Sequence, residues 1–190
     1  MKRLAIVALS ALMSVNAFAL FSETEPNNTR ATADAVLFGN VAPWADVGVL
    51  SLSPNDTDFF KIRLNAGDWL TAITFPIQSN YFAPDTVMAL FDASGTTAIV
   101  WNDDAAGSGN PGYGSAIRWQ ADQTGDYFIA ITGYHGSGQS SISYYEGATH
   151  SQSGSYILTV SVVPVPEPAS MLALGVGLAG LAGLRRRNRK

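Results

Sequence analysis

Acidic and amide side chains alternate along a short segment near the start of the chain, and their spacing fits a calcium site. If the segment is extended, Glu23, Glu25 and Asn27 point to one side, because side chains at i, i+2 and i+4 of a strand share a face. A proline after Glu25 disfavours a helix there. Calcium takes about six to eight oxygen ligands, mainly carboxylates and carbonyls. The alternative is that Asn27 and Asn28 cap a helical turn while the glutamates stay solvated.

Other groups with chemical potential have less support. Asp103 and Asp104 follow an asparagine and precede several glycines, which fits a second cation loop, although Asp and Gly clusters usually form turns. His135 and His150, the two histidines, lie in neither a His-Glu-x-x-His motif nor a recognisable triad. No serine lies in a Gly-x-Ser-x-Gly elbow, and no carboxylate pair is singled out for glycoside hydrolysis. We therefore expect a non-catalytic protein, with a small secreted hydrolase as the alternative.

The segment 165–190 reads VPEPASMLALGVGLAGLAGLRRRNRK and has three blocks: a proline-rich start, an apolar run and a basic end. As a helix, the fourteen apolar residues Met171 to Leu184 would span about 21 Å, less than the roughly 30 Å core of a bilayer. Apolar runs this short are often core helices, which is the alternative. The basic end would resist crossing and favour the cytoplasmic side, and glycines are tolerated in lipid. We therefore expect a transmembrane helix here.

This order of blocks resembles the PEP-CTERM sorting signal of exported bacterial proteins. The resemblance rests on Val165-Pro166-Glu167-Pro168, the apolar run and the terminal arginine cluster. It implies recognition of Pro166, Glu167 and Pro168 by a membrane-embedded exosortase. It also implies removal of the tail and delivery to the cell surface or an extracellular polysaccharide matrix.

The first residues have the pattern of a secretory signal peptide. Lys2 and Arg3 precede an apolar stretch from Leu4 to Leu12, and Ala17-Phe18-Ala19 is a small-x-small cleavage site. An N-terminal core helix is the alternative. We expect residues 1–19 to be removed, so that the mature chain starts at Leu20.

The charge of the middle of the chain argues against a nucleic-acid partner. The whole chain has a formal charge of −4, but residues 20–165 contain fourteen acidic and four basic side chains, a formal −10. Nucleic-acid binding depends on basic surfaces. There are no cysteines, so no disulfide supports the fold. Stability must come from a hydrophobic core or a bound metal.

Alternating apolar and polar residues predict an all-β domain. From Asp58 to Leu64, Phe60, Ile62 and Leu64 fall on one face while Lys61 and Arg63 fall on the other. Turn signals such as Asn65-Ala66-Gly67 separate this run from others like it. We expect further strands at Trp69 to Phe75, Thr86 to Phe91, Ala98 to Trp101, Ala116 to Gln120, Tyr127 to Thr132 and Tyr156 to Val163, and a helical turn within 28–36. Short strands with few helical stretches indicate a two-sheet sandwich.

The order of several short motifs resembles the bacterial pre-peptidase C-terminal domain, which is related to collagenase collagen-binding domains. The resemblance runs from Glu23 to Val163. Its motifs are Glu23-Thr24-Glu25-Pro26-Asn27-Asn28, Asp56-Thr57-Asp58-Phe59, Ala66-Gly67-Asp68, Leu90-Phe91-Asp92-Ala93-Ser94-Gly95, Asn102-Asp103-Asp104, Thr124-Gly125-Asp126-Tyr127 and Gly154-Ser155-Tyr156. It implies a jelly-roll-like β-sandwich. It also implies a calcium site with the ligands Glu23, Glu25, Asn27, Asn28, Asp56 and Asp58.

Aromatic residues offer a binding surface. Exposed rings in loops can stack on sugars or peptides. We expect Trp69, Trp101 and Trp119 in the core, and Tyr113, Tyr134, Tyr144 and Tyr145 at the surface. The Ser- and Gly-rich stretch 133–154 is expected to be a mobile loop or long hairpin.

Together these patterns predict three segments: a signal peptide (1–19), a calcium-stabilised β-sandwich (20–164) and a sorting signal (165–190). The expected protein is exported, held transiently in the inner membrane, and then displayed at the cell surface or in the extracellular matrix. It would serve a binding or structural role there, with an adhesion module for carbohydrate or protein as a further alternative. Its expected partners are an exosortase-type enzyme, the inner membrane, and extracellular polysaccharide or protein.

Overall fold

The computed structural model describes residues 19–35, 44–77, 83–105, 113–165 and 176. Residues 1–18 of the expected signal peptide and nearly all of the expected transmembrane helix fall outside these ranges. Within the described residues, no helix combines the length and the apolar character needed to cross a membrane.

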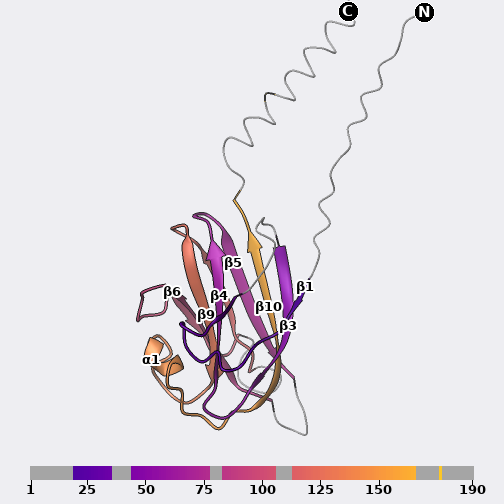
Figure 1. Cartoon of the computed structure of the whole chain (residues 1–190), viewed down its shortest axis with the longest axis vertical. Helices are drawn as coiled ribbons and strands as arrows, with labels where there is room; N and C mark the ends of the chain where they lie inside the picture. The colour runs from indigo at the N-terminus through magenta and orange to yellow at the C-terminus, as the bar shows by residue number, and fades with distance from the viewer. Residues whose placement is uncertain (1–18, 36–43, 78–82, 106–112, 166–175, 177–190) are drawn as a thin grey trace, which may run out of the picture.

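The described chain forms two five-stranded sheets that pack face to face (Figure 1). Sheet A has the order β1-β3-β10-β5-β8, and sheet B has the order β2-β4-β9-β6-β7. The strands of sheet A are β1 (Ala19–Phe21), β3 (Trp44–Leu52), β10 (Gly154–Val163), β5 (Trp69–Pro76) and β8 (Ala116–Gln120). The strands of sheet B are β2 (Asp34–Ala35), β4 (Thr57–Leu64), β9 (Gly125–Gly133), β6 (Thr86–Asp92) and β7 (Val100–Asn102). The pairs β1–β3 and β2–β4 are parallel and the other pairs are antiparallel. This architecture confirms the predicted β-sandwich.

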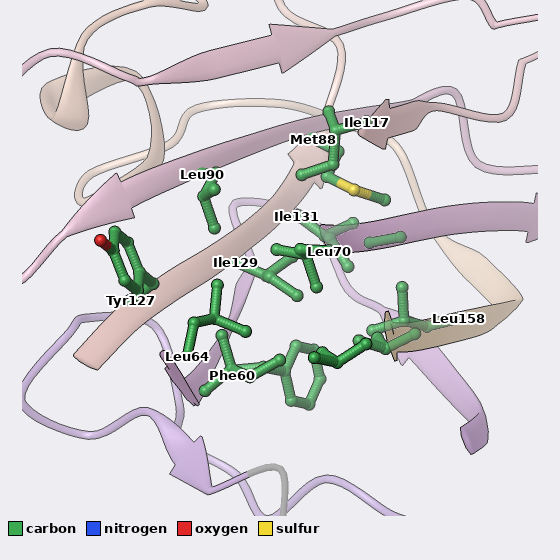
Figure 2. Close-up of a cluster of buried hydrophobic side chains, with 14 of the residues drawn as sticks. Phe60, Leu64, Leu70, Met88, Leu90, Ile117, Tyr127, Ile129, Ile131 and Leu158 are labelled. Carbon is green, nitrogen blue, oxygen red and sulfur yellow. The ribbon is translucent and has the colours of Figure 1, made fainter. Parts of the chain in front are cut away.

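The inner faces of the two sheets form the main core (Figure 2). On β4, Phe60, Ile62 and Leu64 are buried while Lys61 and Arg63 are exposed, as the alternation predicted. Ile129 of β9 and Leu158 of β10 belong to the same cluster and are fully buried. Each such side chain contributes about 1.5–3 kcal/mol when it leaves water, so this core is the main source of stability.

A second apolar cluster lies on the other face of sheet B, under a short helix. The helix, α1 (Ile142–Tyr145), begins at Ser141, whose side chain accepts a hydrogen bond from the backbone N–H of Ser143. Tyr145 is fully buried and meets Phe91 edge-to-face, with ring centroids 5.5 Å apart. The prediction of a mobile loop or long hairpin at 133–154 was therefore wrong, because apolar side chains of α1 cover this face.

Other local predictions also need correction. Strands β1, β2 and β3 were not foreseen. The segment expected to be one helical turn forms a hydrogen-bonded turn, from the N–H of Thr32 to the carbonyl of Thr29, and then enters β2. The aromatic assignments were partly wrong: Trp101 is 43% exposed, whereas Tyr144 is 6% exposed. Neighbouring strands and α1 decide which of these rings are covered.

Candidate metal centres

Three carboxylates from two distant parts of the sequence converge at one edge of the sandwich. Glu23, Glu25 and Asp58 each offer an oxygen, and these oxygens lie within 4.8 Å of one another. Asp58 is the second residue of β4 and is fully buried between the sheets. The backbone N–H of Phe59 donates to the carbonyl of Asn27 (3.1 Å) and so fixes the 23–28 segment beside β4. The structure therefore joins the two halves of the predicted calcium site.

Hydrogen bonds from backbone and side-chain groups hold one oxygen of each of the three carboxylates in place. Ser51 of β3 donates its backbone N–H (2.8 Å) and its hydroxyl (3.1 Å) to Oε1 of Glu23. The hydroxyl of Tyr156 donates to Oδ2 of Asp58. The backbone N–H of Asn27 donates to Oε2 of Glu25 (3.2 Å). Since β3 and β10 belong to sheet A and β4 to sheet B, the site spans both sheets.

Four buried oxygens of the 23–28 segment and Asp58 have no hydrogen-bond partner. They are Oε2 of Glu23, Oδ1 of Asn27, Oδ1 of Asn28 and Oδ1 of Asp58. Asn27 and Asp58 are fully buried, so solvent does not satisfy them. An unsatisfied buried polar atom costs about 1–3 kcal/mol, and such atoms are rare in native proteins. A hard cation such as Ca²⁺ prefers this set of carboxylate and amide oxygens.

The pKa values of the three carboxylates are also consistent with a cation site. Burial raises the pKa of Glu23, and the nearby charges of Glu25 and Asp56 raise it further. Burial and the charge of Asp56 raise the pKa of Glu25. The pKa of Asp58 lies well above its usual value, because the group is buried and faces Glu23. The ionised forms are disfavoured without a counter-charge, and a bound divalent cation would supply one.

Asp56 does not join this group of three. Its Oδ1 accepts from the backbone N–H of Thr57 (3.0 Å) and its Oδ2 from that of Ser53 (3.0 Å). Asp56 therefore caps the turn before β4 and acts on the site through its charge. The resemblance implies that Asp56 is a ligand; in the structure its two hydrogen bonds shape the strand entry, and its charge raises the pKa of Glu23 and Glu25.

Asp34 and Tyr156 take part in the site, but the sequence did not point to either. Oδ2 of Asp34 accepts from the side-chain N–H of Asn27 (3.2 Å) and from the backbone N–H of Thr24 (2.7 Å). The first bond orients the Asn27 amide and leaves its oxygen free. Asp34 lies in β2 and Tyr156 in β10, and no spacing pattern links them to Glu23.

A second acidic group lies at the β6–β7 side of sheet B. Asp85, just before β6, offers an oxygen within 4.8 Å of oxygens from Asp103 and Asp104, which follow β7. One buried oxygen of each has no hydrogen-bond partner. Burial, with the charges of Asp103 and Asp104, raises the pKa of Asp85 to about 6. The sequence indicated only the last two carboxylates.

Asn102, which precedes Asp103 and Asp104 in the predicted second cation loop, has a structural role. Oδ1 of Asn102 accepts from the backbone N–H of Ala116 (2.9 Å) and so links β7 to β8. Gly114 is needed for close packing, because a Cβ there would lie 2.4 Å from the carbonyl oxygen of Thr74. The other glycines of the loop, Gly107, Gly109 and Gly112, lie outside the described residues.

The histidines and the most buried serine hold loops in place. His135 stacks on Tyr144 at 3.7 Å, and its Nδ1 lies 2.7 Å from the carbonyl of Gly133. His150 is 7% exposed, and its Nε2 lies 2.8 Å from the carbonyl of Asp56. The hydroxyl of Ser115 donates to backbone carbonyls of Thr86 and Asp103. Within the described residues, no serine hydroxyl is hydrogen-bonded to a histidine.

Comparison with known proteins identifies the C-terminal segment. Residues 164–187 match the model of the PEP-CTERM protein-sorting motif, which confirms that part of the sequence interpretation. No curated protein matches the chain.

Several solved structures are similar at low sequence identity. The periplasmic g-type lysozyme inhibitor PliG of Aeromonas hydrophila is 15% identical over 77% of this chain and 99% of its own, with a TM-score of 0.43. The pre-peptidase C-terminal domain of a Bacillus anthracis collagenase is 16% identical over 68% of this chain and 94% of its own, with a TM-score of 0.42. The mitogen YPM of Yersinia pseudotuberculosis is 13% identical over 68% of this chain and 94% of its own, with a TM-score of 0.42. The collagenase domain is the type that the order of sequence motifs resembles.

Proposed function

From the PEP-CTERM sorting motif at residues 164–187, we infer that this chain is an exported β-sandwich delivered to the cell surface or the extracellular matrix. The motif begins directly after β10, which ends at Val163. An exosortase-type enzyme would recognise Pro166, Glu167 and Pro168 while the apolar run holds the chain in the inner membrane. Cleavage would then release the sandwich. This proposal rests on the observation that the motif follows β10, the last strand, directly in the sequence.

The test replaces Pro166, Glu167 and Pro168 together with alanine. We expect the variant to accumulate uncleaved in the inner membrane, while wild type loses its basic tail and leaves that fraction. Cell fractionation and intact mass measure both effects. Pro164→Ala is the matched control, because it removes a nearby proline and keeps Pro166, Glu167 and Pro168. Normal release of the triple variant would refute the proposal, and retention of the tail by wild type would indicate a permanent anchor.

We further propose that Glu23, Glu25, Asn27, Asn28 and Asp58 bind calcium, with Asp56 contributing charge only. The four unpaired buried oxygens support this assignment. The ion would tie the N-terminal segment to β4 and neutralise carboxylates that otherwise repel each other. On this view the metal is structural, and the sandwich is a non-catalytic binding or structural module.

An adhesion role is a second candidate, and the outer face of sheet A supports it. Val49, Ile157 and Phe75 are register partners across β3, β10 and β5, and Val49 and Phe75 are 57% and 50% exposed. The charged residue on this face is Arg118 of β8, whose guanidinium lies 4.4 Å over the Trp69 ring. Such an apolar, weakly charged face suits contact with a polysaccharide or protein surface.

Binding to matrix polysaccharide from the producing cells tests the adhesion role. Phe75→Ala should weaken retention of the purified protein, whereas Trp101→Ala, at an exposed ring on sheet B, should leave it unchanged. Equal retention of both variants would argue against this face.

A further inference from the structure

Asp46 of β3 is a buried acid that neither metal group uses. Its side chain is 1% exposed, at a position of β3 that faces the core together with Leu50 and Leu52. Oδ1 accepts from the backbone N–H of Val47 (2.8 Å), but Oδ2 is buried and has no hydrogen-bond partner. Burial raises the pKa of this carboxyl. The ionised form of Asp46 is costly in this position unless a cation pairs with it.

The side chains of the domain do not supply that cation. Residues 20–165 contain Arg30, Lys61, Arg63 and Arg118 as their Lys and Arg residues, and none lies between Ala31 and Phe60. Arg30 pairs with Glu146 (3.5 Å), and Lys61 and Arg63 pair with Asp126 (2.8 and 3.1 Å). Arg118 lies over Trp69 at 4.4 Å. Every arginine and lysine of the domain is therefore engaged elsewhere.

Strand β1 brings a different nitrogen to Asp46. It pairs with β3 in parallel, with Ala19 opposite Asp46 and Leu20 opposite Val47. Paired strands lie about 4.8 Å apart, and this register places the backbone of Leu20 beside Val47, the residue that follows Asp46. Phe21 holds β1 in this register: its ring meets Phe60 edge-to-face at 5.6 Å and covers Gly48, where a Cβ would lie 2.8 Å from that ring.

We propose that cleavage after Ala19 converts the amide nitrogen of Leu20 into an ammonium group that pairs with Asp46. Water adds across the Ala19–Leu20 bond: its hydroxyl joins the Ala19 carbonyl, its hydrogen joins the Leu20 nitrogen, and a solvent proton completes the ammonium. An α-amino group has a pKa near 8, so it is charged at neutral pH. Removal of the leader thus creates the missing partner of Asp46 and strengthens the β1 edge. This inference rests on the export part of the proposed function.

Few charged side chains face Asp46, so the proposed pair between Asp46 and the Leu20 ammonium can be tested. After cleavage Ala19 is gone, and at the remaining register position beside Asp46, β10 presents Val160, which is not titratable. On the opposite sheet, Phe60 of β4 contacts Phe21, and Lys61 is turned outward to Asp126. Glu23, three residues after Leu20, has its Oε1 held by the N–H and hydroxyl of Ser51, so a change in the charge of the N-terminus should act mainly on Asp46.

The test uses the exported chain, purified after processing, with its first residue read by mass spectrometry. Wild type and Asp46→Asn are compared with free and with acetylated α-amino groups, at a fixed calcium concentration. Near pH 7 acetylation reaches the α-amine before lysine, whose pKa is about 10.4. Acetylation should lower the melting temperature of wild type by about 3 °C or more and that of Asp46→Asn by less than about 1 °C.

The acetylation rate gives a second readout. An ion pair that raises the amine pKa by about one unit makes wild type react about tenfold more slowly than Asp46→Asn. Asp126→Asn is the control, because it removes the partner of Lys61 and Arg63 and should react like wild type. The ion pair would be refuted if the processed chain began at a residue other than Leu20. It would also be refuted if acetylation lowered the melting temperatures of wild type and Asp46→Asn equally. A chain that is never exported would instead refute the proposed function.

Discussion

The hydroxyl of Tyr156 donates a hydrogen bond to the carboxylate of Asp58 and thereby joins β10 of one sheet to β4 of the other. Both residues are fully buried. The bond uses Oδ2 of Asp58 and leaves its buried Oδ1 without a hydrogen-bond partner, while one oxygen of Asp58 lies within 4.8 Å of oxygens from Glu23 and Glu25. The same contact therefore stabilises the sandwich and orients a proposed calcium ligand.

Calcium should raise the melting temperature of the exported protein. A ligand that binds only the folded state at one hundred times its Kd adds about 2.7 kcal/mol, which corresponds to roughly 5–10 °C for a domain of this size. Glu25→Gln combined with Asp58→Asn should abolish the rise, whereas Asp122→Asn, at an exposed position, should not. Thermal unfolding in EDTA and in millimolar calcium at fixed ionic strength measures this. Equal melting temperatures in EDTA and in calcium, together with no heat of calcium binding, would refute the calcium site at Glu23, Glu25 and Asp58.

In millimolar calcium, Tyr156→Phe should destabilise the protein by about 1.5–3 kcal/mol, because it removes a buried hydrogen bond to a carboxylate that the proposed ion keeps charged. It keeps the ring in the core, so the loss reports the hydroxyl. Calcium binding should weaken less than in Asp58→Asn, since the carboxylate remains. Denaturant unfolding and calorimetry give the two quantities, and a neutral Tyr156→Phe would contradict the role assigned to this bond.

Asp85 should make the calcium-free protein less stable as the pH rises from about 4 to 6. Its pKa is about 6 in the folded state and about 3.9 when unfolded, so the folded state binds more protons in this window. Stability therefore falls until Asp85 is ionised. Asp85→Asn should raise the melting temperature in EDTA at pH 7.5, by a few degrees, and change it little at pH 4. A lower melting temperature for Asp85→Asn at pH 7.5 would contradict this sign.

Tyr145→Ala should destabilise the protein by about 3–5 kcal/mol, because it empties a fully buried site between α1 and sheet B. Tyr134→Ala removes a ring that is 41% exposed and should cost less than about 1 kcal/mol. Chemical denaturation of both variants measures the difference. Similar small losses would mean that the 133–154 segment is not packed as described.

The local patterns of this sequence determined much of the fold. The alternation in Asp58 to Leu64 defined a strand whose buried and exposed faces the structure confirms, and the strand expected at Ala116 to Gln120 has the same bounds as β8. The sorting motif was also readable, because its three blocks are contiguous. Such features depend on residues near one another in the chain, so side-chain periodicity and composition are sufficient to reveal them.

The tertiary structure alone decided which acids converge and which rings are covered. Asp85 meets Asp103 and Asp104 because β6 pairs with β7, and Asp34 reaches Asn27 because β2 lies beside β4. Trp101 is exposed on an edge strand, whereas Tyr145 is buried under α1. These outcomes depend on strand order and register, which are fixed by packing between residues far apart in sequence. The preferences of a short segment are the same whichever strand becomes its neighbour, so they carry no information about these contacts.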